Sequence, residues 1–130
     1  MIKTDDLGDT LWLKRLGGNG FDIPGSLALT NDGGYVIAGT TTSFGSGSSD
    51  VYLIKTDTNG DTLWTRTYGG VLDDWGESVQ QTADGGYIII GWSQSFGINN
   101  GYDHFYLVKT DANGNEIWYN TFSPYPFSRG

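Results

Sequence analysis

Two tryptophans and the polar residues around them are the side chains best suited to chemistry in this 130-residue sequence. Trp75 follows a pair of aspartates, and Trp92 precedes an asparagine-rich loop. An indole ring can stack on the apolar C–H face of a sugar, while carboxylates and amides hydrogen-bond to the sugar hydroxyls. The alternative is that both tryptophans fill gaps between unequal structural units. The predicted carbohydrate-binding residues are Trp75, Trp92, Asp73, Asp74, Asn99, Asn100 and Tyr102.

Other polar residues are weaker candidates for catalysis. The adjacent pairs Asp73–Asp74 and Asp5–Asp6 could act in glycoside hydrolysis only if two carboxyl groups faced each other about 5 to 10 Å apart. Neighbouring side chains usually point apart, so solvated acidic loops are the preferred interpretation. His104 is the only histidine, and no strand–turn–helix motif supplies a nucleophile for it. We therefore predict no catalytic residue and expect that the protein is not an enzyme.

Two oxygen-rich segments, residues 57–61 and 111–115, invite a calcium interpretation. An EF-hand loop would need a glutamate at its twelfth position, where the sequence has Tyr68 and Phe122. Turns built on an aspartate or asparagine followed by glycine explain both segments without a metal. No metal or other cofactor is predicted.

Composition excludes several classes of partner. The formal net charge is −8 with only 7 Lys and Arg, which disfavours nucleic acid and anionic membrane surfaces. The 15% aromatic content argues against disorder, and the absence of cysteine removes disulfides and thiolate chemistry. The longest apolar run, residues 87–90, is too short for membrane insertion. No signal-peptide pattern opens the sequence, so a signal peptide is either absent or already removed.

Internal repetition is the strongest structural signal. A Lys-Thr-Asp motif begins at residues 3, 55 and 109, which are 52 and then 54 residues apart. Each copy leads to a tryptophan, at positions 12, 64 and 118, which we expect to pack between repeats. Asp-Gly-Gly-Tyr occurs at residues 32–35 and again at 84–87. By contrast, Trp75 and Trp92 stand where the preceding repeat has Ile23 and Thr40.

Each repeat is expected to form four strands, near residues 26–30, 35–42, 51–56 and 62–68 in the first complete copy. Asp-Gly and Asn-Gly turns would join them, and successive apolar residues from Tyr35 to Ala38 indicate a strand covered on both faces. Four short antiparallel strands repeating at this interval are typical of β-propeller blades, whereas a β-sandwich would not require a fixed offset. The predicted fold is all-β, with four-stranded antiparallel propeller blades and about two and a half blades per chain.

The pattern Asp-Gly-Gly-Tyr, apolar strand, Ser-Phe-Gly, then Tyr-Leu-Ile/Val-Lys-Thr-Asp-x-Asn-Gly-x-x-x-Trp covers nearly the whole chain. It resembles repeats of secreted and cell-surface β-propeller proteins of bacteria and archaea. The resemblance implies an extracellular or cell-surface location and an adhesive or ligand-binding module without a shared catalytic constellation.

The chain is expected to form a single repeat domain. It comprises a terminal hairpin (1–18), one blade (about 19–70), a second blade (about 71–123) and a tail (124–130). Propellers have about four to eight blades, so two and a half would leave apolar faces in water. Either several copies close one ring, as a homotrimer or homotetramer, or the chain is a piece of a longer propeller; we favour the homo-oligomer. The terminal hairpin could then supply strands to a neighbouring chain.

The predicted function is a lectin-like, adhesive propeller that binds glycans through multivalent loop sites. The alternative is a structural or protein–protein interaction scaffold with no small ligand, and a glycoside-acting enzyme comes third.

Overall fold

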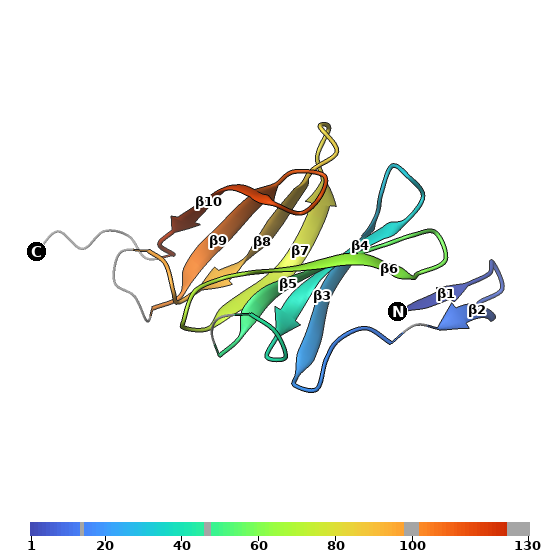
Figure 1. Cartoon of the computed structure of the whole chain (residues 1–130), viewed down its shortest axis with the longest axis horizontal. Helices are drawn as coiled ribbons and strands as arrows, with labels where there is room; N and C mark the ends of the chain where they lie inside the picture. The colour runs from blue at the N-terminus through green and yellow to red at the C-terminus, as the bar shows by residue number, and fades with distance from the viewer. Residues whose placement is uncertain (14, 46–47, 98–101, 125–130) are drawn as a thin grey trace, which may run out of the picture.

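The computed structural model describes residues 1–13, 15–45, 48–97 and 102–124, and in these ranges the protein is built from ten strands without a helix (Figure 1). Consequently none of the described segments is a helix capable of crossing a membrane. All strand pairs are antiparallel, and they form one two-stranded and two four-stranded sheets. The prediction of an all-β chain with four-stranded antiparallel sheets is confirmed.

The strand order in each sheet follows the chain, so every connection within a sheet joins neighbouring antiparallel strands. The N-terminal hairpin contains β1 (Ile2–Thr4) and β2 (Thr10–Leu13). Blade 1 contains β3 (Asp22–Leu29), β4 (Tyr35–Thr41), β5 (Asp50–Thr56) and β6 (Thr62–Tyr68). Blade 2 contains β7 (Asp74–Gln81), β8 (Tyr87–Ser93), β9 (His104–Thr110) and β10 (Glu116–Phe122).

The first strand of blade 1 begins four residues earlier than the sequence suggested. Pro24 and Gly25 favour a break in a strand, yet both lie within β3 at a register shift between Pro24 and Ser26. A proline lacks the N–H that a central strand would need, but β3 is at the edge of its sheet. A β-bulge at an edge strand accommodates both residues.

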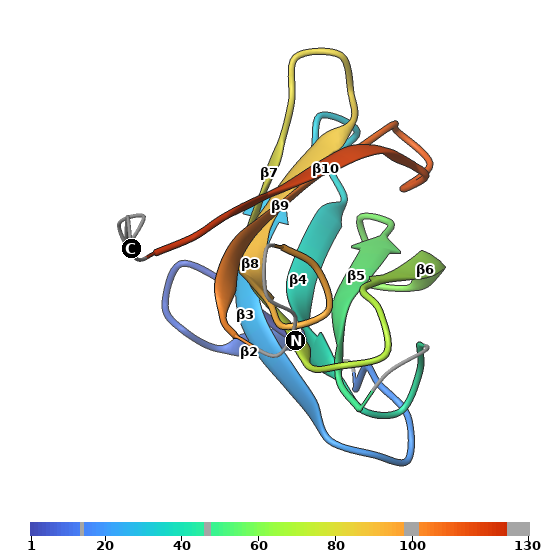
Figure 2. The ribbon, with the colours of Figure 1, turned by 90° about the vertical axis from the view of Figure 1, so that its left-hand side faces the viewer.

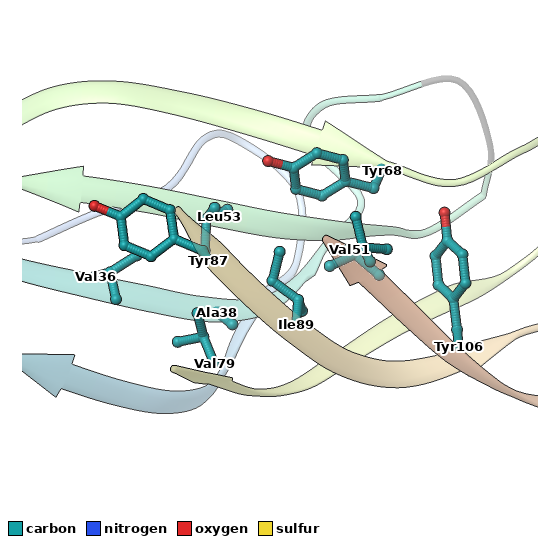
Figure 3. Packing of buried hydrophobic residues seen from close by; sticks show 10 residues of the cluster. Val36, Ala38, Val51, Leu53, Tyr68, Val79, Tyr87, Ile89 and Tyr106 are labelled. Atoms are coloured by element: carbon teal, nitrogen blue, oxygen red, sulfur yellow. The ribbon is translucent and has the colours of Figure 1, made fainter. Parts of the chain in front are cut away.

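The main hydrophobic core lies between the two four-stranded sheets, which pack against each other (Figure 2). Blade 1 contributes side chains from β4, β5 and β6, and blade 2 contributes side chains from β7, β8 and β9 (Figure 3). The buried members of this core are Val36, Ala38, Val51, Leu53, Tyr68, Val79, Tyr87, Ile89, Tyr106 and Val108. Burial raises the pKa of the Tyr68 hydroxyl, which donates a hydrogen bond to the Gly114 carbonyl oxygen at 2.6 Å.

The outward faces of the two blades differ in how well they are covered. On blade 1, Ile37, Tyr52 and Ile54 form a second small core with Met1 and Leu16. The face of blade 2 that points away from blade 1 is open: Ile90, Phe105, Trp118 and Phe122 are all exposed. Their equivalents in the first repeat, Ala38, Val51, Trp64 and Tyr68, pack in the main core. Blade 2 therefore leaves open the face that, in blade 1, is covered by packing against blade 2.

A polar contact recurs in both blades between the Asp-Gly-Gly-Tyr turn and the lysine of the neighbouring strand. Lys55 Nζ lies 3.1 Å from Asp32 Oδ2, and Lys109 Nζ lies 3.1 Å from Asp84 Oδ2. Hydrogen bonds from the Thr30 hydroxyl and the Gly34 amide, followed by Lys55, lower the pKa of Asp32 to about 2. The corresponding groups of blade 2 lower the pKa of Asp84 to about 2.

We predict that Leu53→Ala lowers the free energy of unfolding by about 2 to 5 kcal/mol, because it opens a cavity in a tightly packed core. Leu63→Ala is the matched control on the adjacent strand, and we expect a change within about 0.5 kcal/mol. Leu53 is 0% exposed and Leu63 is 58% exposed. Urea unfolding followed by circular dichroism measures both; equal effects would contradict the assigned core.

We also predict that Asp32 and Asp84 make the free energy of unfolding depend on pH. Because their pKa values in the fold lie below the ordinary aspartate value of 3.8, the ionised forms stabilise the folded state. This stability is fully present above about pH 4 and is lost as pH falls toward about 2. It is modest, because both carboxylates are more than half exposed to solvent. The unfolding free energy of the wild type relative to an Asp32→Asn/Asp84→Asn double variant should shrink over this range; a constant difference would be evidence against the contact.

Candidate functional site

Three aromatic side chains form a row across one face of blade 2. Trp75 on β7 is the cross-strand partner of Trp92 on β8, which is in turn the partner of Phe105 on β9. Directly opposed residues of antiparallel strands place their side chains on the same face. The ring centroids of Trp92 and Phe105 lie 4.4 Å apart with an interplanar angle of 32°. We call Trp75, Trp92 and Phe105 the aromatic row.

The row adjoins an open groove of about 640 Å³ where β3 and β4 of blade 1 meet β7 and β8 of blade 2. The Trp92 indole N–H donates a hydrogen bond to Glu77 Oε1 at 3.1 Å, which fixes the orientation of the ring. Asp103 contributes a second carboxylate and accepts a hydrogen bond from Gln94 Nε2 at 2.9 Å. The groove is lined by Ile23, Pro24, Gly25, Thr40, Trp75, Gly76, Glu77, Trp92 and Asp103.

Close backbone contact between the blades forms this part of the junction. A Cβ on Gly76 would lie 2.4 Å from the Gly39 carbonyl oxygen, and a Cβ on Gly25 would lie 2.6 Å from the Glu77 carbonyl oxygen. Only glycine fits at such an approach. The Gly76 amide also donates to Thr40 Oγ1 at 3.1 Å, which ties the two blades together beside the groove.

Asp74 is fully buried and holds loops together. Its carboxylate accepts hydrogen bonds from the Ser93 hydroxyl, from the Gly70 amide at 2.9 Å and from Ser95 Oγ at 2.6 Å. Gly69 has no room for a side chain here, because a Cβ would lie 2.6 Å from Asp74 Oδ2. These contacts occupy the Asp74 carboxylate beneath the surface.

Blade 1 contains the same arrangement one repeat earlier. Asp22 accepts hydrogen bonds from the Thr41 hydroxyl, from the Gly18 amide at 2.9 Å and from Ser43 Oγ at 2.9 Å. Asp22 and Asp74 therefore serve the fold in both blades. The repeated Gly-Gly and Ser-Phe-Gly segments of the sequence supply their partners.

The remaining predicted binding residues lie in different places. Asp73 is half-buried and accepts a hydrogen bond from Ser49 Oγ at 3.0 Å, and it does not line the groove. Tyr102 is exposed and also lies outside the groove lining. Asn99 and Asn100 fall outside the described residues. Of the predicted set, the groove brings together Trp75 and Trp92.

Sequence reasoning missed Glu77, Asp103 and Phe105. A usable signal existed for two of them, because Glu77 replaces Gly25 and Phe105 replaces Val51 of the preceding repeat. The same lack of repetition had identified the two tryptophans. Asp103 gave no comparable signal, since acidic residues are frequent in the loops of this chain.

The other polar candidates have ordinary structural roles. Asp57 Oδ1 accepts hydrogen bonds from the amides of Asn59 and Asp61, both at 2.9 Å, and Asp111 makes the equivalent contacts. This confirms the turn interpretation of both oxygen-rich segments. His104 is buried at the start of β9, with Nδ1 2.9 Å from the Tyr102 carbonyl oxygen. Within the described ranges, no group of three or more acidic or histidine side chains is arranged to hold a metal ion.

No protein-family model matches this chain, and no curated protein matches it either. The functional inference therefore depends on the geometry of the groove.

We predict that Asp74→Ala lowers the free energy of unfolding by about 2 to 4 kcal/mol, because three donors lose a charged acceptor in a buried setting. Asp73→Ala is the matched control on the neighbouring residue, and it removes one half-exposed hydrogen bond worth about 1 kcal/mol. Thermal and urea unfolding of the two variants give the comparison. A larger effect at Asp73 than at Asp74 would show that the assignment of Asp74 to the fold is mistaken.

Proposed function

We propose that this protein is a non-enzymatic binding module that holds carbohydrate in the groove beside the aromatic row. The observation that carries the proposal is the combination of Trp75, Trp92 and Phe105 in adjacent register positions with the carboxylates of Glu77 and Asp103 at the same groove. Aromatic faces provide the stacking surface for the C–H face of a sugar ring. The carboxylates accept hydrogen bonds from its hydroxyl groups.

The orientation of the Trp92 ring supports recognition of a rigid, flat ligand. Its indole N–H is engaged by Glu77, and its ring packs against Phe105. A side chain that is already fixed loses little entropy when a ligand binds, so more of the stacking energy appears as affinity. A platform of this kind suits a pyranose ring better than a flexible chain.

The charge of the protein selects among sugars. Two exposed carboxylates flank the row, and the whole chain has a formal net charge of −8. Sulfated and uronic-acid sugars would be repelled, because like charges at short range oppose binding. The proposed ligand class is therefore neutral glycans.

The groove stays accessible where two blades are packed together. Ile23 and Thr40 occupy the positions of Trp75 and Trp92 one repeat earlier, at the fully packed junction with blade 2. Both still line the groove, and Ile23 is 64% exposed. A further blade docked on blade 2 would by the same geometry leave Trp75 and part of Trp92 open to solvent. Multivalent display on an oligomer or at a cell surface would raise the apparent affinity.

Binding without turnover fits the surroundings of the two carboxylates. A glycosidase needs one carboxyl group whose environment keeps it protonated as a general acid. Glu77 and Asp103 are both exposed to water at the groove.

A second candidate function, an interaction scaffold without a small ligand, is favoured by a different observation. Ile90 is 46% exposed on the outward face of blade 2, where its equivalent Ala38 is 0% exposed in the first repeat. Trp118 and Phe122 extend the same apolar surface. Such a face is suited to association with another protein surface.

A screen against neutral glycans, followed by calorimetry on any hit, tests the first function. Three variants, Trp75→Ile, Trp92→Thr and Phe105→Val, each install the residue that blade 1 uses at that position, so the fold should tolerate them. We predict that Trp92→Thr weakens binding by roughly ten-fold or more, because the stacking surface is lost. Trp118→Ala is the control, since it removes an exposed tryptophan that does not line the groove.

The screen also separates the candidates. No saturable glycan binding would favour the scaffold. Binding that survives all three substitutions would place the sugar elsewhere. Release of shorter glycans during the assay would show an enzyme instead.

A further inference from the structure

The N-terminal hairpin has the structure of the second half of a blade. β1 and β2 pair with the register Ile2↔Leu13, Lys3↔Trp12 and Thr4↔Thr10. The last two strands of blade 1 pair as Ile54↔Thr65, Lys55↔Trp64 and Thr56↔Thr62, which is the same register 52 residues later. Both pairs shift register at the same point.

This hairpin also packs on blade 1 as β5 and β6 pack on blade 2. The ring centroids of Trp12 and Tyr35 lie 6.0 Å apart at 73°, and those of Trp64 and Tyr87 lie 6.0 Å apart at 64°. Both tryptophans contact the glycine of the following Asn-Gly turn: a Cβ on Gly60 would lie 2.5 Å from the Trp12 ring. The hairpin therefore occupies the position of half a preceding blade (Figure 1).

The described residues contain no counterpart of the other half of that blade. In blade 1 the hairpin β3–β4 pairs with β5 through Tyr35↔Thr56, Val36↔Lys55 and Ile37↔Ile54. In the part of the chain that the structure describes, no strand pairs with the equivalent edge of β1, residues 2–4, because the sheet of β1 contains only β2. Thus β1 offers a free edge with a defined register.

Among the described residues, Lys3 also lacks the ion-pair partner that its equivalents have in the two blades. Its equivalents Lys55 and Lys109 each form an ion pair with the aspartate of an Asp-Gly-Gly-Tyr turn. Lys3 is exposed, and no carboxylate in the described part of the chain forms an ion pair with it. A turn aspartate at the same relative position would complete the set.

An apolar groove of about 1010 Å³ adjoins this edge and extends over blade 1. Leu27 in this groove is 49% exposed, whereas its equivalent Val79 is 5% exposed because the first strands of blade 1 cover it. The floor of the groove includes Ile37, Tyr52 and Ile54. The uncovered region lies on blade 1 in the position that β3 and β4 occupy on blade 2.

We propose that β1 and this groove form a docking site for a β-hairpin of the same repeat type, supplied by a segment outside residues 1–130. The partner carries Asp-Gly-Gly-Tyr followed by apolar residues. Its tyrosine lies opposite Thr4, the next two residues lie opposite Lys3 and Ile2, and its aspartate pairs with Lys3. Strand addition gives the affinity through main-chain hydrogen bonds, and the groove selects the apolar side chains.

The position of the hairpin β1–β2 favours this partner over a complete second copy of the chain. A four-stranded blade docked on blade 1 would need the space that β1 and β2 already fill. The two hairpins of this type within the chain, β3–β4 and β7–β8, are engaged in their own sheets. A two-stranded segment from outside fits the vacancy. The site is separate from the aromatic row, so glycan binding and hairpin docking can succeed or fail independently.

A synthetic peptide with the sequence of residues 22–41 tests the proposal when it is titrated into the full-length protein. We expect saturable 1:1 binding by fluorescence anisotropy. In NMR spectra, the amides of Ile2 to Thr4 should shift and become protected from hydrogen exchange. A peptide of the same composition in scrambled order is the control.

Charge reversal tests the register. Lys3→Glu should weaken binding by roughly two- to five-fold, as expected for a partly exposed ion pair, and a peptide with Asp32→Lys should restore it. Binding without any response at residues 2–4 would mean that the peptide exchanges with β3–β4 of the protein, which would overturn the proposal. Absence of binding would overturn it as well. Concentration-dependent self-association that protects residues 2–4 without peptide would identify a second copy as the occupant instead.

Discussion

The structure depends on one constraint: each four-stranded sheet is apolar on both faces, so each face requires a cover. On β4, Val36 and Ala38 pack toward blade 2 while Ile37 packs toward the N-terminal hairpin. Burying one such side chain contributes about 1.5 to 3 kcal/mol, so a sheet exposed on both sides would forgo most of its stability. Stacking is therefore built into the sequence of a blade, and the core between the sheets is its direct result. The faces at the two ends of the stack are left as acceptor surfaces.

Repeated polar contacts determine how the sheets are held, since apolar packing alone has no direction. Asp22 and Asp74 each connect the start of a blade to a preceding Gly-Gly segment and to the loop after the second strand. Lys55 and Lys109 each connect a central strand to the turn beside it. Since these groups recur with the repeat, the junction between blades keeps its geometry. Their recurrence is also the reason that the N-terminal hairpin can be aligned with β5 and β6.

The fold could be predicted from the sequence further than the site could. The offset of 52 residues and the Asp-Gly and Asn-Gly turns located the strands, because turn residues and periodicity are local signals. The role of Asp74 was not predictable, since its partners Gly70 and Ser95 lie on other segments and the strand register decides where its carboxylate points. Glu77 accepts the hydrogen bond from Trp92 at a register shift between Gly76 and Ser78, and the position of that shift was not predicted from the sequence. A bulge of this kind leaves no distinctive residue pattern.

The differences between the repeats carry the functional information, because the shared positions already satisfy the fold. Ile23, Thr40 and Val51 form one cross-strand row in blade 1, and blade 1 packs well with them. The same row in blade 2 is Trp75, Trp92 and Phe105. Three changes to aromatic residues at adjacent register positions are not required by a sheet that is stable with isoleucine, threonine and valine. These three changes are the basis of the proposed ligand site. At the packed junction Ile23 is still 64% exposed while Val51 is 0% exposed, so a further blade on blade 2 would cover Phe105 and leave Trp75 accessible to a ligand.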